Sequence, residues 1–589
     1  MAWSATMLEP DGRAALTEQL RPPSGFSLIH AVGTTFTLDL TSALAVPLSF
    51  AGHHVRETND PIAILDAVRR ATDRVDVFAQ AGQIAAPRAA SDLLAFLEPM
   101  IHPVIAPRRG ALFHPKIWLL EFGRGEEREY RMLCSSRNLT SDRSWDVMVR
   151  LDGRPAIGQS EVSAPLSDLI NALPGMAVVP MPQERADRIH QLASRIRSVD
   201  WEAPADIREL AFHALGLARP TTIDFGGKRH LVISPFLSDD GLALVTERSV
   251  ERIQVISRAE SLEALSAKTL ARIDGFVLDD AARDTSESDD DPLVGLHAKV
   301  VGLDRASGSR LFIGSANATG AALGGNVEFL VELVGPQPRV GVAAVFGEDS
   351  ALRKLVLSYA ATGDARASEK DTADYGLEAA VRALAAAPMR NTVAAGDDGA
   401  YSITVEVLEM TRVDAGMTTS VHLLTRPGNS APLPQGFGQS SVFVGLPLTD
   451  LTPFLVVRVL DQRGEERSTV VRAELIGDIP HRRDAVLARQ IDNPQKFLRF
   501  LLLLLSLGGE DAGSSLRGDG VGIGDWSGDG GGVFEALVKA LGHHSTGLED
   551  LSRLVERLRA DNPSVLPKGF DDLWASIWSA HLALTKVAP

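Results

Sequence analysis

The sequence predicts an α/β fold in which one domain occurs twice, followed by a small all-β domain and a C-terminal helical domain. Apolar, strand-like segments separated by helical ones fill the first 370 or so residues, and the polar motifs among them recur in the same order. After that region the pattern changes to alternating strands and then to helices. Buried strands separated by helices are typical of a mixed sheet with helices on its faces. A chain of 589 residues also exceeds what one core supports.

The expected domains are 1–180 and 181–370 for the two copies, 371–478 for a β-sandwich or barrel, and 479–589 for the helices. Within the first copy, a strand and an apolar helix fill 24–50, and a helical repeat of apolar residues spans 61–73. The second copy follows a helical stretch near 185–215. The strand-like segments are 75–80, 102–107, 114–122, 130–136 and 145–151 in the first copy, and 230–236, 252–258, 296–303, 309–315 and 326–334 in the second.

Composition excludes several classes of protein. The net charge of −17 argues against a broad surface that coats nucleic acid, although a basic groove is compatible with it. The single cysteine, Cys134, cannot form an intramolecular disulfide and fits a reducing cytosol. The first residues lack the pattern of a signal peptide. The apolar stretch at 497–508 contains Arg499 and is too short to span a membrane, so we expect a buried helix and a cytoplasmic protein without a membrane partner.

The polar motif of the second copy recurs 183 residues upstream. His114 and Lys116 correspond to His297 and Lys299, and both pairs are followed by a serine-containing turn that ends in asparagine. Five positions match in the same order, which packing alone does not explain, and a repeat of this length indicates a duplicated domain. The remaining matched positions are Ser136 and Asn138 with Ser315 and Asn317, and Asp146 with Glu328, while Ser135 stands where the second copy has Gly314.

The residue types suit chemistry on a phosphoryl group. His297 and Lys299 stand two apart in a predicted strand, so their side chains should project from one face. Asn317 follows the next strand, where a turn would expose it. A lysine and an asparagine can donate hydrogen bonds to phosphoryl oxygens, and an imidazole can act as nucleophile or as acid and base. We expect Ser136 and Ser315 to contact the substrate beside these groups.

The pattern His-x-Lys-x4-Asp followed by Gly-Ser-x-Asn resembles that of the phospholipase D superfamily. The resemblance covers roughly residues 25–340. The first copy departs from the pattern, with Glu121 in the aspartate position and Ser135 in place of the glycine, where we expect the serine to crowd the turn. The second copy matches the pattern throughout, with His297, Lys299, Asp304, Gly314, Ser315 and Asn317.

The resemblance implies a mechanism and a site. Two copies face each other across a pseudo-twofold axis, one histidine attacks phosphorus, and the other protonates the leaving oxygen and then activates water. Asp146 and Glu328 match the acidic position that orients each histidine, whereas Asp304 and Glu121 should hold local structure. Neither a metal nor another cofactor is implied. The predicted catalytic residues are His114, Lys116, Asn138, His297, Lys299, Asn317, Glu328 and Asp146.

The sequence itself agrees with the absence of a metal. It contains no His, Cys and Asp cluster with the spacing of metal ligands. The adjacent histidines at 53–54 and 543–544 would diverge on a strand or helix. Cys134 is expected to be a buried strand residue rather than a reactive thiol.

Nucleic acid is the expected substrate. Arg108 and Arg109 precede the first histidine and either track a polyanionic backbone or are ordinary surface residues. A lipid substrate would need an exposed apolar docking surface, which we do not expect. The chain is therefore expected to be a nuclease, with a phospholipase or phosphatidyl transferase and a non-enzymatic binding scaffold as alternatives. It is similar to nucleases of bacterial defence or restriction systems, which implies a separate helicase or ATPase subunit, because the sequence has no ATPase motif.

Several questions stay open at this stage. The segment 279–292 holds seven acidic residues and is either a solvated loop or a flap that competes with a polyanionic substrate. The sequence does not decide between DNA and RNA, the strandedness of the substrate, the oligomeric state, or which histidine is the nucleophile. The duplication does imply that one chain can complete a site alone.

Overall fold

The structure, a computed structural model, describes residues 16–50, 69, 71–87, 92–141, 144–219, 221–279, 295–363, 369–396, 399–409, 411, 413–414, 416–436, 438–480, 482–505, 537, 541, 547–567 and 570–585. Some predicted features lie outside these residues. They are most of the helical repeat at 61–73, the acidic segment beyond Asp279 and both pairs of adjacent histidines.

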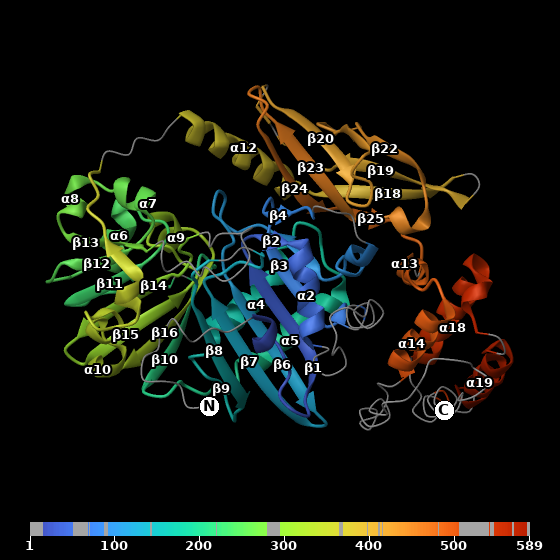
Figure 1. Cartoon of the computed structure of the whole chain (residues 1–589), viewed down its shortest axis with the longest axis horizontal. Coiled ribbons are helices and arrows are strands. Elements are labelled where there is room, and N and C mark those ends of the chain that lie inside the picture. Colours follow the sequence, from blue (N-terminus) through green and yellow to red (C-terminus); the bar gives the residue numbers. More distant parts are fainter. Residues whose placement is uncertain are drawn as a thin grey trace.

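The first half of the duplicated region is built on a mixed seven-stranded sheet (Figure 1). Its order is β5-β3-β1-β6-β7-β8-β9, with β1, β3 and β5 parallel and the remaining pairs antiparallel. The strands are β1 Ser27–Thr35, β3 Val75–Gln80, β5 Ile101–Val104, β6 Ile117–Arg124, β7 Glu127–Ser135, β8 Met148–Pro155 and β9 Val199–Trp201. The apolar helix predicted within 24–50 is α2 Leu40–Phe50.

The second half repeats this topology in an eight-stranded sheet, ordered β10-β16-β15-β14-β11-β12-β13-β17. Its run β13-β12-β11-β14-β15-β16 corresponds strand for strand to β5-β3-β1-β6-β7-β8, and the three strands β11, β12 and β13 are again parallel. The strands are β10 Glu209–Leu215, β11 Arg229–Ile233, β12 Ile253–Ile256, β13 Ile273–Leu278, β14 Val300–Arg305, β15 Gly308–Gly314, β16 Glu328–Gly335 and β17 Val356–Ser358.

The helical stretch expected near 185–215 is only partly helical. Helix α4 spans Ala164–Met176 and α5 spans Gln183–Ile196, after which β9 and β10 follow. The expectation is wrong for 209–215, because these residues pair along their whole length with β16, a partner more than 100 residues away in the chain. Local sequence does not reveal a pairing partner so far away in the chain, and the pairing overrides the local helical preference.

Strands of both sheets share one apolar core. Ile117 of β6 and Cys134 of β7 lie in the same buried cluster as Ile313 of β15 and Phe329 of β16, together with apolar side chains of α4 and α5. The thiol of Cys134 is buried and donates to the carbonyl oxygen of Ile313 at 3.8 Å, and burial raises its pKa to about 12. The cysteine is therefore the buried strand residue that was predicted, and the two halves pack as one unit.

Two four-stranded sheets form the β-sandwich that follows, in the orders β22-β19-β18-β25 and β21-β20-β23-β24. Val405 and Phe443 of one sheet and Val421 and Val457 of the other meet in a single buried cluster, which helix α12 (Glu369–Ala386) joins. Neither α12 nor β18 was singled out from the sequence. The strands are β18 Met389–Ala395, β19 Tyr401–Val407, β20 Thr418–Leu423, β21 Ser430–Pro432, β22 Ser441–Leu446, β23 Phe454–Leu460, β24 Glu466–Arg472 and β25 Glu474–Ile476.

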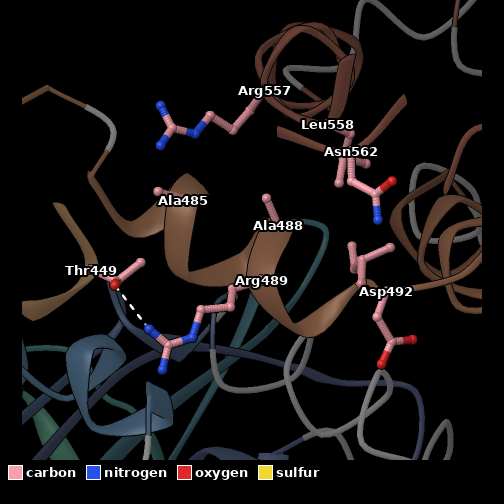
Figure 2. A pocket seen from close by; sticks show the side chains of 9 residues that line it. Thr449, Ala485, Ala488, Arg489, Asp492, Arg557, Leu558 and Asn562 are labelled. Atoms are coloured by element: carbon pink, nitrogen blue, oxygen red, sulfur yellow. Dashed lines mark hydrogen bonds between the residues drawn. The ribbon is translucent and has the colours of Figure 1, made fainter. Parts of the chain in front are cut away.

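The chain ends in helices α13 Arg482–Gln490, α14 Pro494–Leu505, α18 Gly547–Asp561 and α19 Phe570–Thr585. Phe497 and Leu501 of the apolar stretch are fully buried among these helices, so the stretch forms part of a core as predicted. Among the described helices, none combines the length and the apolarity that crossing a bilayer requires. A pocket lies between α13 and α18 (Figure 2), and its lining residues, among them Arg489 and Asn562, belong to neither copy of the motif. The predicted fold class, a duplicated α/β unit with a β-sandwich and a helical domain, is confirmed.

Candidate active site

Two symmetry-related contacts join the halves beside the histidines. Phe113, just before His114, forms a parallel bridge with Val327, just before Glu328. In the other half Leu296, just before His297, forms a parallel bridge with Trp145, just before Asp146. The backbone N–H of His114 donates to the oxygen of Val327 at 2.9 Å, and that of His297 donates to the oxygen of Trp145 at 2.8 Å. Each histidine is thereby placed beside the acidic position of the opposite half, as a pseudo-twofold arrangement requires.

The histidines and lysines do not lie within strands, contrary to the prediction. His114 and Lys116 precede β6, and His297 and Lys299 precede β14. The backbone N–H groups of the two histidines bond across the halves. The carbonyl oxygens of Lys116 and Lys299 instead accept N–H groups of their own sheets, from Ser135 at 2.9 Å and from Gly314 at 3.4 Å. Each ammonium donates back to the carbonyl oxygen of its own histidine, at 3.0 Å for Lys116 and 2.8 Å for Lys299. The His-x-Lys spacing therefore fixes the lysine against the backbone of the histidine.

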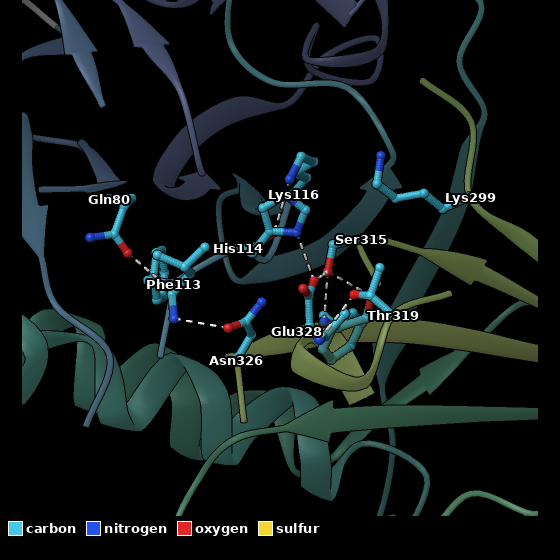
Figure 3. A network of polar contacts seen from close by, with 12 residues as sticks. Gln80, Phe113, His114, Lys116, Lys299, Ser315, Thr319, Asn326 and Glu328 are labelled. Atoms are coloured by element: carbon cyan, nitrogen blue, oxygen red, sulfur yellow. Dashed lines mark hydrogen bonds and ion pairs between the residues drawn. The ribbon is translucent and has the colours of Figure 1, made fainter. Parts of the chain in front are cut away.

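His114 is held by a carboxylate from the other half (Figure 3). Its Nδ1–H donates to Oε2 of Glu328 at 2.9 Å, and Oε2 also accepts the hydroxyl of Ser315. Glu328 is fully buried and the side chain of His114 is 12 % exposed. The Phe36 ring packs against the imidazole edge to face, and the two ring centroids are 5.0 Å apart. A carboxylate on one ring nitrogen sets the tautomer and leaves Nε2 with the lone pair.

Burial governs the protonation of these groups. Burial, together with the charges of Lys116 and Lys299, lowers the pKa of His114 to about 4, while attraction to Glu328 opposes the shift. Burial alone would raise the pKa of the Glu328 carboxyl, but attraction to His114 and Lys116 and the hydrogen bonds to His114 and Ser315 lower it. At neutral pH the pair is thus a neutral imidazole beside an ionised carboxylate.

The pKa values of both lysines are lowered by burial and by neighbouring positive charges. Burial lowers the pKa of Lys116 well below its ordinary value, and the positive charge of Lys299 adds to the shift. Burial also lowers the pKa of Lys299 to about 7, while Glu328 opposes the shift and Arg258 adds to it. Both side chains are 2 % exposed. A bound anion would favour the charged form of both lysines and so raise their pKa values again.

The acidic residue beside His297 differs from Glu328. The side chain of Asp146 is 30 % exposed, and its Oδ2 lies 3.9 Å from Nε of Arg137. Its negative charge reaches Lys299 and raises the pKa of that lysine. The two halves therefore place an acidic side chain at equivalent positions, but only that of Glu328 is completely withdrawn from water.

The asparagines lie on loops that a hydroxyl holds in the same way in both halves. The hydroxyl of Thr35 accepts the N–H after Asn138, and that of Ser234 accepts the N–H after Asn317, each at 3.0 Å. Each hydroxyl in turn donates, at 2.7 Å, to the carbonyl oxygen two residues further along the chain. Thr35 and Ser234 were not predicted from the sequence, because a serine or threonine at the end of an apolar strand is common and gives no functional signal.

The amides of the two asparagines have different surroundings. Oδ1 of Asn138 accepts the N–H of Thr37 at 3.4 Å, which leaves the amide NH2 to donate. Oδ1 of Asn317 is buried and accepts no hydrogen bond within the part of the chain that the structure describes.

The serines of the two turns serve the protein rather than the substrate. Ser136 is fully buried, and its hydroxyl accepts the N–H of Val147 at 2.9 Å. The hydroxyl of Ser315 accepts the N–H of Phe329 at 3.0 Å and donates to Glu328. The predicted direct substrate contact of both serines does not fit this placement, because backbone groups occupy both hydroxyls. Ser315 positions Glu328, and through it His114.

Gly314 and Ser135 occupy matching positions, one before each of these serines, and a different local contact explains each of them. A Cβ on Gly314 would lie 2.1 Å from the backbone oxygen of Phe329, so the second half requires glycine. In the first half the hydroxyl of Ser135 accepts the N–H of Arg137 at 2.9 Å. The side chain of Ser135 therefore supports the turn rather than crowding it.

A second matched pair of positions distinguishes the halves. Gln80 is the last residue of β3, and its Oε1 accepts the N–H of Phe113 at 2.6 Å. Arg258 follows β12 at the matching place, and its guanidinium donates to the oxygen of Leu296 at 3.1 Å. Both side chains thus support the residue that precedes a histidine, but only the second half places a positive charge there. Neither residue was predicted from the sequence, since neither belongs to a recurring motif.

The remaining predicted residues lie around this centre. Arg108 is exposed and donates to the oxygen of Gly324 in the second half at 2.7 Å, so it bridges the halves, and Arg109 is exposed. Asp304 accepts the hydroxyl of Ser309 at 2.6 Å and the N–H of Val342 at 3.1 Å. Glu121 pairs with Arg195 at 2.7 Å. Asp304 and Glu121 thus hold local structure, as the resemblance implied.

The described residues contain no group of three or more His, Cys, Asp or Glu side chains arranged to hold a metal ion. Two sheets of the same strand order, with a His and Lys pair from each half beside their common seam, are the arrangement that the resemblance to the phospholipase D superfamily implied.

Comparisons with known proteins find likeness only among solved structures. No family model matches the chain, and no curated protein matches it. Yeast tyrosyl-DNA phosphodiesterase is 15% identical with a TM-score of 0.34, over 54% of this chain and 85% of that one. Polyphosphate kinase from Porphyromonas gingivalis is 15% identical with a TM-score of 0.32, over 61% and 49%. Phosphatidylserine synthase from Haemophilus influenzae is 12% identical with a TM-score of 0.31, over 59% and 84%. Likeness at this level carries no argument about function.

Proposed function

We propose that the chain is a phosphodiesterase that cleaves nucleic acid through a phosphohistidine. The observation that carries the proposal is the pair of cross-half bridges, which bring His114 and Lys116 together with His297 and Lys299 at one seam. One imidazole nitrogen forms a bond to phosphorus while the bond to the leaving oxygen breaks, and the second imidazole donates its proton to that oxygen. The second imidazole then takes a proton from water, whose oxygen attacks phosphorus and releases the first histidine.

His114 is the nucleophile in this proposal. Burial keeps its imidazole neutral, and the carboxylate of Glu328 holds its Nδ1–H, so that Nε2 carries the lone pair for attack. His297 lies beside the more exposed Asp146 and takes the part of acid and base. Lys116, Lys299 and the two asparagines stabilise the negative charge that builds up on the phosphoryl oxygens.

A nucleic-acid substrate fits the surroundings of the site better than a lipid. Cationic side chains gather near the seam, with Arg258 behind Leu296 and Arg108 across the two halves, in a chain that is acidic as a whole. The apolar stretch that was the candidate for lipid docking contributes Phe497 and Leu501 to a buried core. A role in bacterial defence or restriction, beside a separate helicase or ATPase, stays part of the proposal and is tested by co-purification from the native host.

The test is cleavage of plasmid, single-stranded DNA and RNA in excess EDTA, beside a phosphatidylcholine assay. We expect EDTA-resistant cleavage of nucleic acid that is lost in both His114→Asn and His297→Asn. Reactions of the His297 variant quenched with detergent at alkaline pH, where the P–N bond is stable, should retain a phosphorus label on the protein, whereas those of the His114 variant should not. Choline release with no cleavage of nucleic acid would transfer the assignment to a phospholipase. Binding of nucleic acid without cleavage by the wild-type chain would leave the non-enzymatic scaffold.

A further inference from the structure

Phe236 presents an aromatic ring to solvent at the edge of the site. It follows the end of β11, its carbonyl oxygen accepts the hydroxyl of Ser234, and the next residue, Leu237, forms a parallel bridge with Ala318. Ala318 directly follows Asn317, so Phe236 lies beside the loop that carries this asparagine. The ring is nevertheless 48 % exposed, whereas most phenylalanines of the described chain are buried.

Arg258 connects this ring to the reactive centre. Its guanidinium carbon lies 5.0 Å from the centroid of the Phe236 ring. The same guanidinium donates to the oxygen of Leu296, the residue before His297. Its charge also contributes to the lowered pKa of Lys299. A single side chain, that of Arg258, thus links the Phe236 ring to the backbone just before His297.

The first half has no equivalent of this pair. The position that matches Phe236 is Thr37, as judged from the hydroxyl contacts of Thr35 and Ser234, and the position that matches Arg258 is the neutral Gln80. The neighbouring Phe36 turns the other way, with its ring against His114 and 5.8 Å from Nζ of Lys116. An exposed aromatic ring backed by a guanidinium therefore belongs to the second half, whereas the ring of the first half lies against the histidine and lysine of the motif.

We propose that Phe236, backed by Arg258, is the platform on which an unpaired nucleobase next to the scissile phosphate stacks, so that the substrate is single-stranded nucleic acid. The inference rests on the proposed nuclease function and specifies its substrate. An exposed ring beside a phosphate site binds any base through its π-face, and Arg258 contributes a charge for the adjoining phosphate. In a duplex the base faces are already stacked and out of reach.

The charge of Arg258 separates this substrate from a choline lipid. Aromatic rings do bind quaternary ammonium groups, but here the guanidinium of Arg258 already lies over the ring, and its charge also reaches Lys299. A second cation would be repelled, whereas a polyanion that carries aromatic bases satisfies both the ring and the charges.

The test compares three probes on the full chain, namely a short single-stranded DNA, its duplex, and the same strand with abasic residues on both sides of the cleaved phosphate. For Phe236→Ala we expect KM on the intact strand to rise by about tenfold or more, with kcat little changed, because a lost base stack costs about 1–3 kcal/mol. KM for the abasic strand should already be high in the wild type and should not rise further. Phe236→Tyr keeps a ring and should behave as the wild type does.

Tyr375→Ala is the matched control. Tyr375 on α12 is also an exposed aromatic, 68 % exposed, with the guanidinium of Arg382 at 5.8 Å, but it lies beside the β-sandwich. Its removal should leave KM unchanged on all three probes. Because Phe236 is exposed, its variant should melt at the wild-type temperature, and a circular-dichroism melt checks this.

Two outcomes would overturn the inference while the proposed function stands. One is an unchanged KM for Phe236→Ala on the single strand. The other is equal cleavage of duplex and single strand by the wild type. If the wild-type chain cleaves none of the probes, the proposed function itself fails, and the two failures are thus distinguished.

Discussion

His114 in the first half donates its Nδ1–H to Oε2 of Glu328 in the second half, at a distance of 2.9 Å. The contact makes each half incomplete alone, because the histidine and the carboxylate that orients it come from different copies of the domain. The same carboxylate accepts the hydroxyl of Ser315, so a side chain of the second motif positions the histidine of the first.

Glu328→Gln should abolish most of the activity. The amide keeps the shape of the side chain but loses the charge that fixes the tautomer of His114, and loss of a comparable carboxylate costs roughly 10⁴-fold in rate in a serine protease. We expect a fall in kcat of at least about 100-fold, measured on single-stranded DNA. Asp146→Asn, at the matching and more exposed position, should cost less. An equal loss in both variants would contradict the unequal roles of the two halves.

The rate should depend on pH through Lys299 and His114. Nucleophilic attack needs neutral His114, so kcat/KM should rise as pH increases through about 4, the pKa to which burial lowers this imidazole. Anion binding needs charged Lys299, so kcat/KM should fall as pH increases through about 7. Lys299→Arg keeps its charge over this range and should move the fall to higher pH. A fall at the same pH in that variant would assign it to another group.

Gly314→Ala should destabilise the second half. The added Cβ would lie 2.1 Å from the backbone oxygen of Phe329, so β15 or β16 must shift. Overpacking of this kind costs about 1–3 kcal/mol, which a denaturant titration measures as a lower midpoint. Gly324→Ala is the control, because its added Cβ meets nothing within 4 Å. Equal midpoints for the wild type and the Gly314 variant would refute the close approach.

The C-terminal helices are fastened to the first half by a buried ion pair. Arg482 of α13 donates to Oε2 of Glu98 at 2.7 Å, and both side chains are almost fully buried. Arg482→Met leaves a buried carboxylate without its cation and should cost about 3 kcal/mol of unfolding free energy. The double variant with Glu98→Met should recover part of this loss. Arg559→Met removes the cation of an exposed pair with Asp571 and should change little.

The sequence by itself determined the duplication and the chemistry. The two histidines, lysines and asparagines recur at a fixed order and separation, and the apolar segments around them predicted most strands, because both signals are local to each copy. The β-sandwich and the buried helix at 494–505 followed from local periodicity in the same way.

Only the tertiary structure decided which residues of one copy contact and orient those of the other. No spacing in the sequence shows that Glu328 serves His114, that Ser315 acts on Glu328, or that Arg258 matches Gln80. Each of these relationships crosses between chain segments far apart in the sequence and depends on which backbone groups the bridges at the seam occupy. The lowered pKa values of His114, Lys116 and Lys299 likewise arise first from burial, which is a property of the assembled halves and not of either motif.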